Sequence, residues 1–162
     1  MNGNSKIITF YSYKGGVGRS MALANVALLL AEEYKVIVVD WDLDIEDPGL
    51  TNIFDIDKEQ IKIGLIDLFN SYKDMLKRNE VPTNEDLIDI DKYLLKIDYD
   101  FNSSSIYLLP SGCFDNNYAK KVNNFDWEDF YENYNGYGFI NYLKEKLKDK
   151  ADFILVHRFH TS

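Results

Sequence analysis

The stretch FYSYKGGVGRSMALANVALLL, Phe10 to Leu30, joins a β-rich segment to a run of helix-forming residues through a glycine-rich loop. Such a loop binds phosphate because its backbone N–H groups point into one concavity at the positive end of the following helix. Side chains would block that approach, and Gly15, Gly16 and Gly18 leave it open. The hydroxyl of Ser20, at the predicted helix start, can cap the helix or join a magnesium shell.

The loop departs twice from the common phosphate-loop pattern G-x-x-x-x-G-K-[ST]. Tyr13 replaces the first glycine and Arg19 replaces the lysine. A purely structural turn with a helix cap, and a plain surface role for Arg19, are the competing interpretations. A dinucleotide fingerprint is excluded because the glycine spacing is wrong, and a protein kinase because its catalytic-loop motif is missing from this sequence.

Strands and helices are expected to alternate along the chain. This pattern predicts an α/β fold, a three-layer P-loop NTPase-like domain with a mainly parallel sheet. The first two strands read as buried. The expected strands are Lys6 to Tyr11, Tyr34 to Asp40, Ser105 to Gly112 and Asp152 to His157. The expected helices are Ser20 to about Glu33, Ile63 to Lys77, a short one near Leu87 to Leu95, and two or three between 116 and 150, broken near Gly136 and Gly138.

Composition narrows the class of protein. The chain has 162 residues, 46% hydrophobic and 28% charged, which fits one globular domain. A net charge of −9 argues against a nucleic-acid backbone or an anionic membrane as the main partner. No secretory leader or membrane helix is expected. The single cysteine, Cys113, cannot form an internal disulfide, so a cytoplasmic location is expected.

Acidic residues cluster between positions 40 and 59. One interpretation is a solvated acidic loop. The other is that some of these carboxylates serve Mg²⁺, which takes oxygen ligands from one or two carboxylates together with phosphates. For Asp42 and Asp44 both interpretations stay open.

The segment KGGVGRS, residues 14–20, resembles the deviant phosphate loop of the ParA/MinD family of P-loop ATPases, K-G-G-x-G-K-[ST]. VIVVDWD, residues 36–42, resembles the second strand of that family with its D-x-D switch. The resemblance is closer to a subgroup in which the loop reads KGGVGR. Two further segments match that subgroup, LDIEDPGLT at 43–51 and YLLPSGCFDNNYAKKVNNFDWEDFY at 107–131.

The resemblance implies ATP and Mg²⁺ as cofactors, hydrolysis of ATP, and self-association as a nucleotide-sandwich dimer. Lys14 would reach the phosphates of a partner subunit, and Asp42 would position the attacking water. Ser20 would face Mg²⁺, and Asp40 would lie near the metal through water, with Asp44 a weaker candidate. The implied phosphate-binding residues are Lys14, Gly15, Gly16, Val17, Gly18, Arg19 and Ser20.

The C-terminal segment departs from the family. The resemblance implies that the strand DFILV ends in an aspartate, the Walker B acid that holds the magnesium shell, but His157 stands there. The expected domain is therefore residues 1–156, apparently truncated after the fourth strand, with an atypical tail at 157–162. His157 and His160 could be read as a metal pair, but two histidines in a terminal tail more often have no such role.

A DNA string that encodes Arg158 to Ser162 can, when it is read one base later, encode Asp152 to Leu155 again. One hypothesis is therefore that a short duplication shifted the reading frame here. The alternative function is a non-hydrolysing nucleotide-binding assembly module, with Arg19 and His157 marking lost catalysis.

Overall fold

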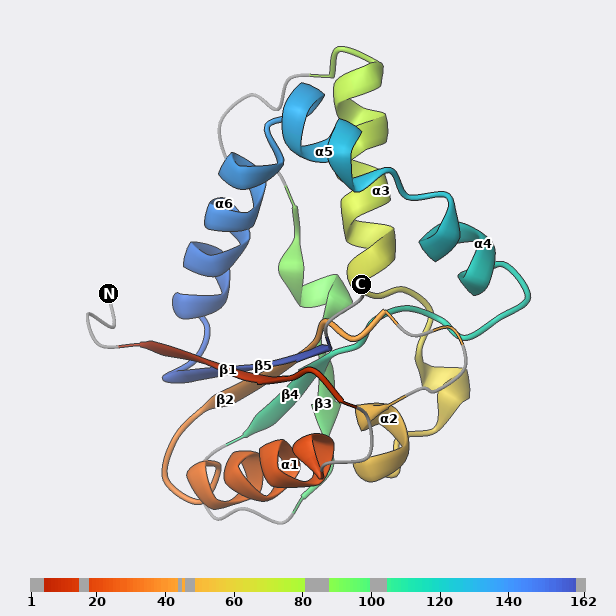
Figure 1. The fold of residues 1–162 in the computed structure, drawn as a ribbon. Helices are drawn as coiled ribbons and strands as arrows, with labels where there is room; N and C mark the ends of the chain where they lie inside the picture. The colour runs from red at the N-terminus through yellow and green to blue at the C-terminus, as the bar shows by residue number, and fades with distance from the viewer. Residues whose placement is uncertain are drawn as a thin grey trace.

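A computed structural model of the chain describes residues 5–14, 18–43, 45, 49–80, 88–99 and 105–159 (Figure 1). Helices and strands alternate as the sequence predicts. In chain order they are β1 (Lys6–Ser12), α1 (Arg19–Leu30), β2 (Val36–Asp40), α2 (Leu50–Ile53), the 3₁₀ turn η1 (Lys58–Gln60), α3 (Leu65–Lys77), the 3₁₀ turn η2 (Ile90–Tyr93), β3 (Leu95–Ile97), β4 (Ile106–Leu109), α4 (Tyr118–Asn123), α5 (Trp127–Asn133), α6 (Gly136–Lys148) and β5 (Phe153–Phe159).

The strands form one sheet in the order β1-β5-β2-β4-β3. β5 runs parallel to both β1 and β2, and β2 runs parallel to β4. Only the short β3, paired with β4, is antiparallel among the described strands. The predicted mainly parallel sheet is confirmed, and β5 lies between the two strands that α1 connects.

Helices cover both faces of the sheet, which gives the predicted three layers. Figure 1 shows α1 and α2 on one face and α3, α5 and α6 on the other. β2 is buried at every position because its side chains alternate between two cores. Ile37 and Val39 join the aromatic core around Phe69 of α3. Val36 and Val38 pack with Leu23 and its neighbours on α1.

The structure corrects two expectations about strands. β1 is not buried: its side chains are exposed or half-buried, because within the described sheet it pairs with β5 alone and forms an edge. The sheet has five strands rather than four, since β3 was not predicted. Part of the expected helix near Leu87 to Leu95 is the 3₁₀ turn η2, which leads into β3. Residues 81–87 lie outside the described chain.

Several element boundaries also differ from the predicted ones, and two of these differences bear on α6 and β5. α6 begins at Gly136 and contains Gly138, so the break falls just before it, at Asn135 in a left-handed conformation with φ of 51°. β5 continues to Phe159, two residues beyond the predicted end of this strand. Among the described residues, no helix is both long enough and apolar enough to cross a bilayer.

Two leucines of α1 provide a matched test of this packing. Leu23 is fully buried against the sheet, whereas Leu29 is 67% exposed on the same helix. Leu23→Ala should lower the free energy of unfolding by roughly 2–5 kcal/mol, because it leaves a cavity in the core. Leu29→Ala should change it by less than about 0.5 kcal/mol. Urea unfolding followed by circular dichroism measures both; equal effects would contradict the placement of α1.

Candidate functional site

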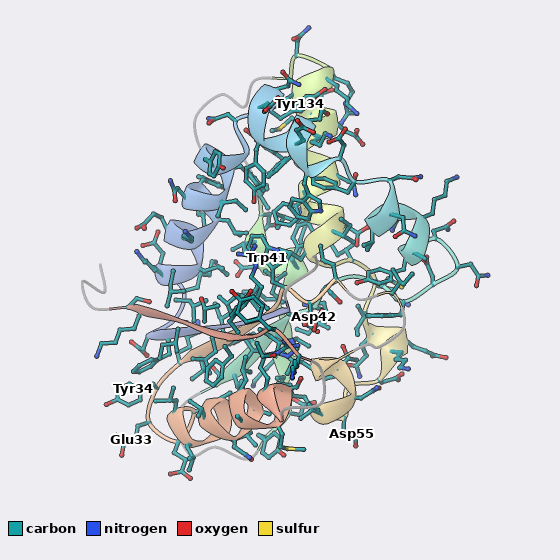
Figure 2. All side chains as sticks on the ribbon, in the orientation of Figure 1. Glu33, Tyr34, Trp41, Asp42, Asp55 and Tyr134 are labelled. Carbon is teal, nitrogen blue, oxygen red and sulfur yellow. The ribbon has the colours of Figure 1, made fainter. Side chains whose placement is uncertain are left out.

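The candidate site lies where β1, β5 and β2 end, beside the start of α1. Parallel strands carry their carboxyl ends to the same edge of a sheet, where ligands of α/β folds bind. The strand register places His157 of β5 between Phe10 of β1 and Asp40 of β2. Gly18 precedes α1 with φ of 75°, a conformation that glycine adopts without strain. Figure 2 labels Trp41 and Asp42, which follow the end of β2.

A hydrogen bond between His157 and Asp40 forms the centre of the site. His157 Nδ1 lies 3.1 Å from Asp40 Oδ1, and both side chains are only 1% exposed. His157 Nε2 accepts a hydrogen bond from Arg19 Nε at 3.0 Å. Because a guanidinium nitrogen can only donate, Nε2 carries no proton, and the proton is on Nδ1, which donates to Asp40. The imidazole in this arrangement is neutral.

Ser20 also contacts this imidazole. Its hydroxyl lies 2.8 Å from His157 Nε2, and the unprotonated nitrogen makes the hydroxyl the donor. The first turn of α1 is therefore fastened to β5 through the side chain of Ser20.

Arg19 joins three elements of the site. Its Nη1 donates to Ser12 Oγ at 2.9 Å, and its Nη2 forms a 2.8 Å ion pair with Asp42 Oδ2. The side chain is 11% exposed and that of Asp42 is 16% exposed, so the pair is largely shielded from water. The plain surface role for Arg19 is therefore wrong, and Asp42 is not part of a freely solvated loop.

The segment after β2 packs against Asp40. A Cβ atom at Gly49 would lie 3.2 Å from Asp40 Oδ2, and the φ of 51° at this glycine disfavours any other residue. The backbone N–H of Asp42 also points to Asp40 Oδ1, at 3.4 Å. Gly49 belongs to the segment LDIEDPGLT, and its lack of a side chain lets the chain pass this buried carboxylate.

The structure thus brings five of the predicted site residues together, Gly18, Arg19, Ser20, Asp40 and Asp42. Lys14 is exposed at the loop, where its backbone carbonyl accepts a hydrogen bond from Ser12 Oγ at 3.0 Å. Other predicted residues lie outside the described chain, namely Gly15, Gly16, Val17, Asp44 and His160. The role of the loop N–H groups therefore stays a prediction.

The residues present do not fit a magnesium ion shared by Ser20 and Asp40. The imidazole of His157 is hydrogen-bonded to both and lies between them. Mg²⁺ demands oxygen ligands in near-octahedral geometry, and an imidazole supplies a nitrogen. Among the described side chains, no group of three or more His, Cys, Asp and Glu could hold a metal. The predicted metal role of Ser20 and Asp40 would require His157 to leave both.

Sequence reasoning places His157 in an atypical tail, whereas the structure puts it at the centre of the candidate site. The sequence signal for the placement of His157 is the alternation of side chains between the two faces of β5. Leu155 packs in the core beside α1, so the side chain two positions later faces the same layer.

A cleft of about 470 Å³ opens beside Asp42 on the opposite face of the sheet. Trp41 and Trp127 line it and also pack against Phe69 of the aromatic core. Burial raises the pKa of Tyr131 in the cleft wall, and the positive charge of Arg158 partly offsets this shift.

A family model described as an AAA domain matches residues 5–127 of the chain. The chain belongs to this family. Solved structures place it more closely, among the ParA/MinD-like P-loop ATPases. A comparison with curated proteins found no match.

Three solved structures illustrate the likeness. A putative plasmid partition protein from Borrelia burgdorferi B31, bound to AMPPNP, is 28% identical over 96% of this chain and 52% of its own, with a TM-score of 0.54. The septum site-determining protein MinD from Pyrococcus horikoshii OT3, complexed with Mg-ADP, is 25% identical over 94% and 48%, with a TM-score of 0.58. A ParA family ATPase from Chlorobium tepidum TLS is 21% identical over 97% and 52%, with a TM-score of 0.61, and supports the fold alone. The chain therefore spans about half the length of each structure.

The bond between His157 and Asp40 predicts thermodynamic coupling between the two residues. His157→Ala should lower the free energy of unfolding by roughly 1.5–3 kcal/mol, because it leaves a buried carboxylate without its donor. The loss should be smaller in an Asp40→Asn background, where position 40 carries no charge. Urea unfolding of both single variants and the double variant measures the coupling. Arg158→Ala, at the exposed neighbouring position of β5, is the control; additive effects at 40 and 157 would contradict the bond.

Proposed function

We propose that this chain is a nucleotide-binding module that holds the phosphates of ATP at the start of α1. The observation that carries the proposal is the convergence of Gly18, Arg19 and Ser20 with the ends of β1, β5 and β2. The guanidinium of Arg19 suits phosphate, since its N–H groups can bind two oxygens at once. Relatives support the ligand class: one is complexed with Mg-ADP and another is bound to AMPPNP.

The family resemblance also supports self-association driven by nucleotide. Lys14 is exposed at the loop, and the resemblance gives its ammonium the role of meeting the phosphates of a second copy. Under this proposal ATP is sandwiched between two chains, and its binding controls their dimerisation.

Two forms of the function differ in hydrolysis. In a hydrolysing switch, Asp42 positions the attacking water. In a non-hydrolysing assembly module, nucleotide is bound but not cleaved. The geometry favours the second form, because a histidine stands where the resemblance implies the carboxylate that holds the magnesium shell.

Thermal or urea unfolding with and without ATP tests the proposal. ATP at about 100 times its Kd should raise the free energy of unfolding by about 2.7 kcal/mol. Lys14→Ala should weaken binding about tenfold or more, because a charge-assisted contact to phosphate is lost. Lys96→Ala is the matched control, since Lys96 is exposed on β3 at the opposite edge of the sheet.

An unchanged stability of the wild-type chain in ATP would contradict the proposed site. Phosphate release then separates the two forms. We expect none above the buffer background; release that Asp42→Asn abolishes would establish the hydrolysing switch instead.

A further inference from the structure

We propose that nucleotide binding at this site does not depend on magnesium, because the imidazole of His157 occupies the space between Ser20 and Asp40 that a cation would need. The inference rests on the proposed function of the loop as a phosphate site. It adds the chemical form of the ligand: the site binds the free nucleoside triphosphate anion as well as its magnesium complex.

The first support is that His157 engages both oxygen-bearing groups at once. Its Nε2 accepts from the Ser20 hydroxyl at 2.8 Å, and its Nδ1 donates to Asp40 at 3.1 Å. A cation could take these oxygens only after the imidazole left them. Asp40, 1% exposed, would then lose the side-chain donor that helps to compensate its burial.

The second support is that the backbone holds His157 in place. The residue lies within β5, paired with Phe10 of β1 and Asp40 of β2. Its carbonyl accepts a hydrogen bond from the N–H of Trp41 at 2.9 Å. No loop movement can withdraw the imidazole, so it could leave only by turning its side chain within a closely packed site.

The third support concerns charge. In a metal-dependent site a divalent cation offsets the negative phosphates. Here Arg19, at the first position of α1, supplies a permanent positive charge. Phosphate oxygens are acceptors that compete with Asp42 for its guanidinium, and Asp42 can turn toward water because it lies at the edge of an open cleft.

Titration of the wild-type chain with a fluorescent ATP analogue, in excess EDTA and in millimolar Mg²⁺, tests the inference. We expect the two Kd values to agree within about twofold. Binding that is about tenfold or more tighter with Mg²⁺ would overturn the inference but leave the proposed function standing. Binding in neither condition would remove the proposed function, and the inference with it.

Variants of position 157 test whether His157 is the residue that makes nucleotide binding independent of magnesium. His157→Asp returns an oxygen ligand and should make binding about tenfold tighter in Mg²⁺ than in EDTA. His157→Asn is the matched control, since its amide nitrogen can still donate to Asp40 while the side chain stays uncharged, and it should stay indifferent to magnesium. An aspartate variant that folds, as judged by circular dichroism, yet ignores magnesium would overturn the role of His157. If that variant does not fold, the wild-type and asparagine titrations decide.

Discussion

The arrangement of the site depends on one hydrogen bond, from the buried imidazole of His157 to the buried carboxylate of Asp40. A carboxylate in such a place is costly without a donor, and the neutral imidazole provides one without adding a charge. The same ring accepts from Arg19 and Ser20, so its unprotonated nitrogen fixes the start of α1. The ends of β5 and β2 and the start of α1 are thereby tied together by a single side chain.

The two departures from the family pattern contact each other. Arg19 stands where the resemblance expects lysine, His157 stands where it expects aspartate, and the two side chains are hydrogen-bonded at 3.0 Å. An ammonium is a compact point charge, whereas the planar fork of arginine reaches several acceptors in fixed directions. The fork spans Ser12, His157 and Asp42 together, which explains why arginine suits this site.

The charges of the side chains in the site limit the reactions that it can support. Arg19 is ion-paired to Asp42, and Asp40 is hydrogen-bonded to His157, whose neutral imidazole adds no charge. His157 takes the position where the resemblance implies the carboxylate that holds a magnesium shell. An arrangement of this kind favours binding of ATP over its cleavage. The positive charge that a metal ion supplies in other sites comes here from Arg19.

Local patterns predicted most of the fold. β2 was predictable because its unbroken apolar run needs burial on both faces, and α3 because its apolar residues recur at helical spacing. β3 is only three residues long, too short for any period to appear. The exposure of β1 could not be predicted, because it depends on which strands lie beside it in the sheet.

In the candidate site, the phosphate-loop residues and the acids at 40 and 42 were apparent from motifs. The link from His157 to Asp40 was not, since it joins positions 117 residues apart and requires the strand order.

The most direct test of this account is a crystal structure of the chain with a non-hydrolysable ATP analogue and Mg²⁺ in the buffer. The account predicts the triphosphate at the start of α1, Arg19 turned from Asp42 to the phosphates, and His157 still bonded to Asp40. A triphosphate bound elsewhere, or His157 turned out with a cation between Ser20 and Asp40, would contradict it.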